Sequence, residues 1–175
     1  MMRRVTLVTI IFSTLMMLSP LFAGEAKIAY FDSDRIRNEW DEWKNAQAKF
    51  DEIVAKWQDQ AQKMEDEIKK MQEEYQRQEL MLSEEKRIEK QRLIQEKQQK
   101  YQEFLASIFG QGGKADQKNQ ELTKPLYEKI NRALTNIANK YGYTVIFDIN
   151  GSSIAYIDPS LDITDELLQE LKTEK

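Results

Sequence analysis

Carboxylates are the most abundant side chains in this sequence that could act as an acid or a base, but they are spread along the chain and form no motif. The chain has 30 Asp and Glu residues, 26 Lys and Arg residues, and neither histidine nor cysteine. The commonest general base, the commonest metal ligand and all thiolate chemistry are therefore excluded. Because carboxylate pairs on exposed helical faces are solvated charges, we expect no enzyme activity, no cofactor and no metal site.

A second candidate for chemistry is Gly112-Gly113-Lys114, which resembles the end of a phosphate-binding loop. That motif needs an earlier glycine where this chain has Ile108, and a hydroxyl side chain where it has Ala115. No predicted strand precedes it, so we expect no nucleotide binding. A formal net charge of −4 gives no basic field, and nucleic acid is therefore not an expected partner.

The remaining candidates for binding are apolar side chains, and their spacing predicts the elements that carry them. No Pro or Gly occurs from Ser33 to Phe109, which favours helix. Apolar residues recur at spacings of 3 and 4, which is typical of a coiled coil. The first such stripe is Phe50, Ile53, Trp57, Ala61, Met64, Ile68, Met71 and Tyr75; a second contains Ile94, Tyr101, Leu105 and Ile108, and a third Tyr127, Ile130, Leu134, Ile137 and Tyr141.

The phase between the first two stripes is lost at Leu80–Ser83, where Ser83 could cap a new helix. We therefore predict a tight reversal with its tip near 79–84, which makes an antiparallel helical hairpin. The alternative is one continuous helix of about 75 residues and ~110 Å.

Three glycines should interrupt the returning helix, because each costs about 1 kcal/mol relative to Ala inside a helix. These residues, Gly110, Gly112 and Gly113, are hinge candidates, and a simple loop is the alternative. Pro125 then suits the first turn of a helix that restarts after Thr123 or Lys124.

Short β-prone segments lie near both ends of the chain and should join one small sheet. Lys27–Phe31 predicts a strand, and Asp32 begins a helix-capping cluster. Thr144–Asp148 and Ser153–Ile157 predict a hairpin around Asn150-Gly151, a turn signal that also fits a glycosylation sequon. A short helix should follow with its cap at Thr164, and Trp40 and Trp43 should pack onto this part of the molecule. The predicted fold class is α+β, with a long antiparallel helical hairpin (a coiled-coil arm) on a small β-rich body.

The first 23 residues have the organisation of a cleaved signal peptide. Arg3 and Arg4 precede an apolar stretch, Val5–Leu18, and a small-residue region ends at Ala23. A retained membrane anchor is the alternative, but this stretch is shorter than the roughly 20 residues that span a bilayer. The mature chain would be 24–175, with a net charge of −6, and it would be exported to the periplasm.

The mature chain resembles the Skp (OmpH-like) family of periplasmic chaperones. The resemblance rests on the signal peptide, the charged hairpin and the two ends of the mature chain. The terminal segments are KIAYFDSDRI at 27–36, YGYTVIFD at 141–148 and DPSLDITDELL at 158–168.

The resemblance implies a jellyfish-like homotrimer whose β-rich bodies join the subunits and whose three hairpins surround a cavity. It implies an ATP-independent holdase that keeps unfolded outer-membrane β-barrel proteins from aggregating in that cavity. The corresponding single chaperone domain spans 24–175, with a body at 24–48 and 122–175 and an arm at 49–121. The residues expected to build the trimer body are Ile28, Tyr30, Val145, Phe147, Ile154 and Tyr156.

The arm departs from the best-known members of that family, whose arms are strongly basic. Residues 63–100 hold 10 basic and 10 acidic side chains, which argues against attraction of acidic clients or lipopolysaccharide. Flexible thioethers and aromatic rings could instead contact clients, although the same residues could form the seam of the hairpin. These candidates are Trp57, Met64, Met71, Met81 and Leu82. An alternative function is a structural coiled-coil protein of the envelope that bridges folded partners.

Overall fold

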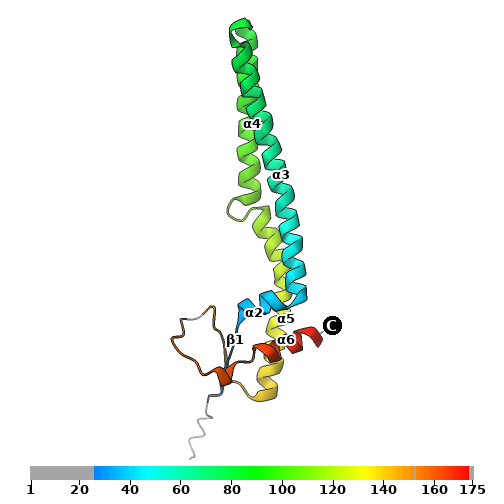
Figure 1. The fold of residues 1–175 in the computed structure, drawn as a ribbon, viewed down its shortest axis with the longest axis vertical. Helices are drawn as coiled ribbons and strands as arrows, with labels where there is room; N and C mark the ends of the chain where they lie inside the picture. Colours follow the sequence, from blue (N-terminus) through cyan, green and yellow to red (C-terminus); the bar gives the residue numbers. More distant parts are fainter. Residues whose placement is uncertain (1–25, 152, 174–175) are drawn as a thin grey trace, which may run out of the picture.

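A computed structural model describes residues 26–151 and 153–173, and the predicted signal peptide lies outside the described residues. A long helical hairpin stands on a small base to which both ends of the described chain contribute (Figure 1). The elements are β1 (Ile28–Phe31), α2 (Ser33–Glu39), α3 (Asp41–Gln78), the 3-10 turn η2 (Glu79–Met81), α4 (Glu84–Phe109), α5 (Lys114–Tyr141), β2 (Val145–Asp148), the 3-10 turn η3 (Pro159–Leu161) and α6 (Thr164–Thr173).

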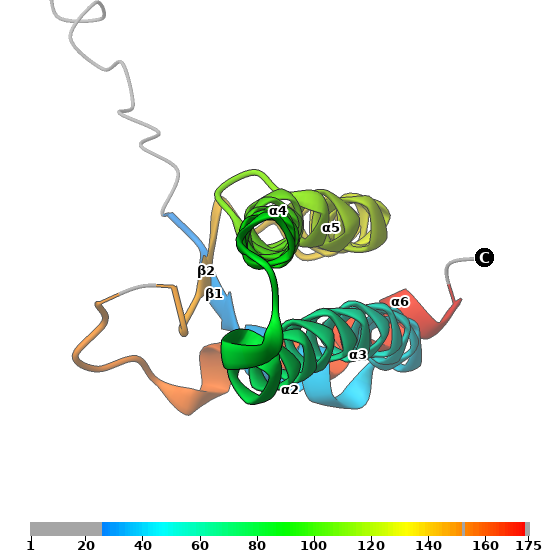
Figure 2. The same ribbon diagram turned by 90° about the horizontal axis from the view of Figure 1, so that it is seen from above.

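The arm is formed by α3 on one side and by α4 followed by α5 on the other (Figure 2). The alternative of one continuous helix is wrong, because the chain reverses at η2 and α4 then begins at a Ser83 cap. The Ser83 hydroxyl accepts a hydrogen bond from the Lys86 N–H. All eight residues of the first apolar stripe, from Phe50 to Tyr75, are buried or half-buried on α3. The arm is therefore a hairpin whose seam follows the heptad pattern.

The returning side of the arm is interrupted once, at the glycine loop, which comprises residues 110–113. The predicted second restart after Thr123 or Lys124 is wrong, because α5 runs without a break from Lys114 and contains Pro125. Proline removes a backbone donor and leaves a carbonyl in the preceding turn unpaired. Pro125 is exposed, so water can hydrogen-bond that carbonyl and the helix continues.

The sheet has two parallel strands, which come from opposite ends of the described chain. Ile28 pairs with Val145 and Tyr30 with Phe147. The predicted hairpin between Thr144–Asp148 and Ser153–Ile157 is wrong, since the second segment forms no strand. The first segment forms β2, which pairs with β1 instead. Asn150, which was expected in the hairpin turn, donates a hydrogen bond from its side-chain amide to Asp32 Oδ1 at 2.6 Å. The prediction that strands from both ends share one sheet is confirmed.

One face of this sheet packs on a core made mainly by helices, so the base is less β-rich than predicted. Trp40 and Trp43 are buried there, as the sequence predicts, but α2 and α3 are separate helices because Trp40 is extended between them. The α5 stripe is shifted from the predicted one, and Tyr127 and Tyr141 are exposed. The base core consists of Ala29, Phe31, Ile36, Trp40, Trp43, Leu126, Ile130, Ala133, Ile137, Ile163, Leu167, Leu168 and Leu171.

Candidate functional site

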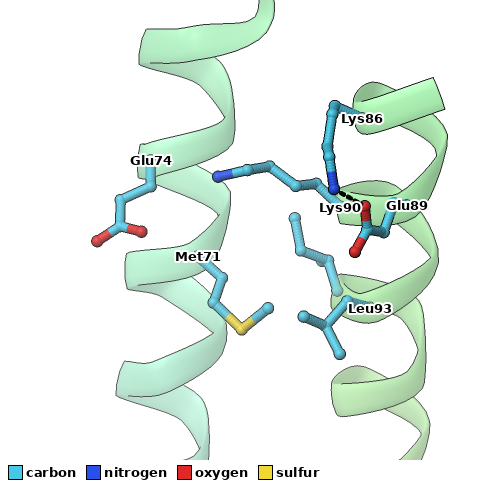
Figure 3. A pocket seen from close by; sticks show the side chains of 7 residues that line it. Met71, Glu74, Lys86, Glu89, Lys90 and Leu93 are labelled. Atoms are coloured by element: carbon cyan, nitrogen blue, oxygen red, sulfur yellow. Dashed lines mark hydrogen bonds and ion pairs between the residues drawn. The ribbon is translucent and has the colours of Figure 1, made fainter. Parts of the chain in front are cut away.

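A hollow lies between α3 and α4 near the tip of the arm, and we call it the arm groove. Its volume is about 300 Å³. Met71 of α3 and Leu93 of α4 point toward each other across it, and Lys90 extends over them toward α3 (Figure 3). Leu93 is 43% exposed, so its burial in the hairpin is incomplete. The arm groove is lined by Met71, Glu74, Lys86, Glu89, Lys90, Leu93 and Ile94.

Polar contacts join the two helices beside the groove. Lys90 Nζ donates to Gln78 Oε1 at 3.0 Å. The Gln91 amide donates to the Tyr75 hydroxyl at 2.7 Å, and that hydroxyl donates to Glu79 at 3.1 Å. Burial and the Glu79 carboxylate raise the pKa of Tyr75, so its hydroxyl stays protonated and able to donate near neutral pH. These contacts link α3 to the start of α4 without filling the apolar space between Met71 and Leu93.

The other side of the hairpin carries a second hollow with a different lining. Its residues are mainly amides and charged groups, with Ile68 and Tyr101 as the apolar contributions. Gln102 lies there, nine residues from Leu93 and thus on the opposite face of α4. The second hollow is larger, at about 570 Å³, and its apolar lining is one aliphatic and one aromatic residue, whereas the arm groove has three apolar side chains, Met71, Leu93 and Ile94.

The tip of the arm exposes two large apolar side chains in sequence. Leu80 is 98% exposed and Met81 is 80% exposed, while Leu82 is half-buried. Both exposed residues belong to η2, whose first residue, Glu79, is instead half-buried and accepts a hydrogen bond from the Tyr75 hydroxyl. Leu80 and Met81 thus contribute almost nothing to the hairpin's own packing.

The other two client-contact candidates lie lower on α3. Trp57 and Met64 are half-buried within the seam stripe, between Ile53 and Ile68. Each shows part of its side chain to solvent and part to the returning helix. The structure therefore spreads the five candidates along α3 and the tip instead of gathering them into one pocket, and only Met71 lines the arm groove.

The glycine loop is a defined turn that its hydrogen bonds hold in place. Gly112 has a φ of +69°, its N–H donates to Asp116 Oδ2, and its carbonyl accepts from the Gln117 amide. A Cβ on Gly113 would lie 2.6 Å from the Ile108 carbonyl oxygen, and one on Gly110 would lie 2.3 Å from that of Ala106. All three hinge candidates are therefore glycine for a local steric or conformational reason.

The loop also absorbs a difference in length between the two sides of the arm. The ion pairs Glu42–Lys129 and Glu67–Lys97 join the two sides below and above it. From 42 to 67 α3 covers 25 positions, whereas from 97 to 129 the returning side covers 32, a difference of seven. Buried residues nevertheless continue on both sides of the loop, with Ile94 and Ile108 on α4 and Leu126 and Ile130 on α5.

The outer face of the sheet is a second apolar surface, on the opposite side from the base core. Ile28, Val145 and Phe147 are 37%, 40% and 37% exposed. Tyr30 shares their face in the paired register but is only 8% exposed, because the chain around Asp162 pairs with it. Burial and the nearby carboxylates of Asp162 and Asp158 raise the pKa of Tyr30. We call Ile28, Tyr30, Val145 and Phe147 the outer sheet face. The other two residues expected in the trimer body, Ile154 and Tyr156, lie in the irregular segment after β2, and Tyr156 is 81% exposed.

A polar cluster ties the two halves of the base together at the carboxyl ends of the strands. The Asp32 N–H donates to the Thr164 hydroxyl at 2.9 Å. Burial alone would raise the pKa of Asp32, but hydrogen bonds from the Arg35 N–H, the Asn150 amide and the Asp34 N–H outweigh it and lower that pKa. Among the described residues, no group of three or more carboxylates could hold a metal ion. The cluster is thus a helix cap and a junction.

The client-contact residues predicted from the sequence include only Met71 of the arm groove, and they omit Leu80, one of the two exposed apolar residues at the tip. Leu93 falls outside the stripe that contains Ile94, and Leu80 lies where the heptad phase is lost. Lys86, Lys90 and Leu93 have helical spacings of 4 and 3, which places them on one face of α4. That spacing was the available signal, although it does not identify the residues of α3 that face them.

Comparison with known proteins agrees on one family. Residues 27–171 match the outer membrane protein (OmpH-like) family. Over 67 residues the chain is 36% identical to the chaperone protein Skp of Yersinia enterocolitica; the match covers 38% of this chain and 38% of that protein.

A solved structure supports the fold. It is the crystal structure of an OmpH-like protein from Caulobacter crescentus CB15, with a TM-score of 0.69 and 14% identity, and the match covers 83% of each chain. Within the described ranges, none of the helices combines the length and apolar character needed to cross a membrane.

Proposed function

We propose that this chain, which belongs to the OmpH-like outer membrane protein family, is an ATP-independent holdase chaperone of the periplasm. Its clients would be unfolded outer-membrane β-barrel proteins, kept from aggregating in a cavity between helical arms. The observation that carries the proposal is the pair of highly exposed apolar side chains, Leu80 and Met81, at the tip of the arm far from the base core. Contiguous exposed apolar side chains commonly mark a surface that meets a partner, and these two are adjacent.

We further propose that the base assembles three copies through the outer sheet face. Ile28, Val145 and Phe147 are each more than one-third exposed on a two-stranded sheet that is too small to be stable alone. Burial of this face between subunits would remove apolar surface from water, at about 25 cal/mol per Å². The body at 24–48 and 122–175 would then carry assembly, and the arm at 49–121 would carry client contact.

Client retention in this proposal depends on many weak contacts. Each candidate offers a client only a small apolar surface. Trp57, Met64, Met71 and Leu82 are half-buried, and Met81 is exposed at the tip. Several arms around one client raise the effective concentration of these contacts, so the client is held although each contact breaks quickly. The balanced charge of the arm means that the net charge of a client would matter little.

The test is the mass of the mature protein, alone and with a urea-unfolded outer-membrane barrel protein diluted into the solution. We expect a trimer that takes the client into one soluble complex and suppresses light scattering at one trimer per client. A monomer or dimer that lets the client aggregate at every salt concentration would reject the proposal. That result would fit a structural protein that bridges folded partners.

A further inference from the structure

The arm groove combines an aliphatic floor with a rim that carries both signs of charge. Met71 and Leu93 form the floor, and Ile94 is buried beside them. With a volume of about 300 Å³, the groove is at the lower end of the range for ligand pockets and suits one large side chain at a time. Because Met is unbranched and polarizable, the floor can adapt to aliphatic or aromatic shapes.

The rim has one cation, Lys90, and one carboxylate, Glu74, that form no ion pair within the described residues. Hydrogen bonding from Lys86 lowers the pKa of Glu89, and the charge of Lys90 adds to that effect. Lys86 is neutralised by Glu89 within 2.5 Å on the same helix. Lys90, in contrast, donates to the neutral Gln78 amide, and Glu74 takes part in no salt bridge within the part of the chain that the structure describes. A charged group on an occupant could pair with either one, and Lys90 would exchange a neutral acceptor for a stronger, charged one.

We propose that the arm groove binds extended segments in which large apolar side chains alternate with polar or charged ones. This inference rests on the proposed function, since strands of membrane β-barrels alternate in this way. In an extended chain, successive side chains point to opposite sides. One apolar side chain enters between Met71 and Leu93, and its polar neighbours turn outward to Lys90 and Glu74.

The size of the groove argues for an unfolded segment and against a second folded copy as its occupant. A stable interface between folded proteins buries about 1,200–2,000 Å² in total. The groove offers room for a single side chain, with charged residues on its rim, and Leu93 is the main exposed aliphatic group in it. Such a site suits brief contacts with a flexible chain that can present one residue after another.

The experiment uses two fluorescent ten-residue peptides of identical composition (Leu, Tyr, Thr, Lys and Asp). In one peptide apolar and polar residues alternate, and in the other they are grouped in two blocks. Fluorescence anisotropy with the intact mature protein measures binding of both. We expect the alternating peptide to bind about tenfold more tightly. Both peptides can place one apolar side chain in the groove, but only the alternating one also places polar neighbours at Lys90 and Glu74, and tenfold corresponds to about one hydrogen bond to a charged group.

Two variants and a matched control assign that preference to the groove. Leu93→Glu should weaken the alternating peptide about tenfold, because it places a carboxylate on the apolar floor. Gln102→Glu adds the same charge on the opposite face of α4 and should leave binding unchanged. Leu93 is partly exposed, so helicity should survive, and circular dichroism checks this. If Leu93→Glu loses helicity, Met71→Gln serves as the second groove variant.

Equal affinity for the two peptides, or equal losses in Leu93→Glu and Gln102→Glu, would overturn the inference. It would also be overturned by a concentration-dependent mass increase that Leu93→Glu abolishes, because the groove would then hold a second copy. Failure of the inference is distinguishable from failure of the proposed function. If the wild type suppresses aggregation of the unfolded barrel protein without peptide preference, only the groove assignment falls; if it does not suppress aggregation, the holdase proposal falls.

Discussion

Substitution of Gly112 by alanine tests whether the glycine loop is a defined turn. The φ of Gly112 is +69°, and an added Cβ would meet nothing within 4 Å, so the whole effect is conformational. An L-residue in the left-handed region costs about 1–2 kcal/mol. The lower flexibility of alanine in the unfolded chain offsets about 0.4–1 kcal/mol of this. We expect a net loss of about 1 kcal/mol in the free energy of unfolding.

Substitutions at Gly113 and at Gly112 should differ in their loss of stability, because the first is limited by steric contact and the second by backbone conformation. Gly113→Ala has no positive φ to maintain, but its Cβ would lie 2.6 Å from the Ile108 oxygen and 2.8 Å from the Gly110 oxygen. Since both are backbone atoms, the loop has to move, and we expect a larger loss than for Gly112→Ala. Gly112→Asn should lose less than the alanine variant, because Asn tolerates the left-handed region. Gln111→Ala, on the same loop, should be nearly neutral.

Urea unfolding followed by circular dichroism measures these differences, with all variants at one protein concentration because assembly would add to apparent stability. Equal losses for Gly112→Ala and Gly112→Asn would refute the argument from φ. Wild-type stability of Gly113→Ala would refute the steric argument.

The same variants separate a hinge from a loop. If Gly112 is a hinge, Gly112→Asn keeps the fold but slows uptake of a large unfolded client in stopped-flow fluorescence. If residues 110–113 are only a connection, the uptake rate of this variant equals that of the wild type. The hydrogen bonds of Gly112 to Asp116 and Gln117 make the second result our expectation.

Three further predictions concern the base. Phe147→Asp, on the outer sheet face, should preserve helicity but disperse the assembly, because an unpaired carboxylate is costly to bury between subunits; sedimentation that still shows a trimer would contradict this. Leu167→Ala, in the base core at 0% exposure, should cost about 3 kcal/mol by urea unfolding, and a loss under about 1 kcal/mol would exclude the observed packing. The lowered pKa of Asp32 stabilises the fold above its unfolded pKa of about 3.9, so the thermal midpoint should fall as the pH drops below about 4. Asp32→Asn should remove that part of the pH dependence.

Features of the fold that depend on neighbouring residues could be predicted from the sequence. The seam of α3 follows from its 3–4 periodicity, and Asp32 caps α2 as its position predicts. Gly142, at the end of α5, has the left-handed φ of +75° that a helix-ending glycine commonly adopts. In each case the physical cause lies within a few residues of the effect.

Features that depend on distant residues could not be predicted in the same way. Val145–Asp148 is β-prone in any reading, but the nearby Asn150-Gly151 favoured a local hairpin over the distant partner β1. The phase of α5 was misjudged because Tyr127 fits an apolar stripe equally well, whereas the buried face includes the small Ala133. The arm groove needs the relative positions of α3 and α4, which a heptad pattern with a phase break does not define.

The hairpin brings both ends of the described chain back to the base, and this arrangement suggests an order in which the parts of the chain fold. Lys27 and Thr144 are hydrogen-bonded across 117 positions of sequence, and closing so long a flexible loop carries a large entropic cost. The helical hairpin, by contrast, can zip up from its tip through local contacts, which form fast. Once Glu42 and Lys129 are paired at 2.8 Å, only short segments separate the two ends of the base. During synthesis β1 leaves the ribosome long before β2. We therefore expect the arm to form first and to bring the two strands together.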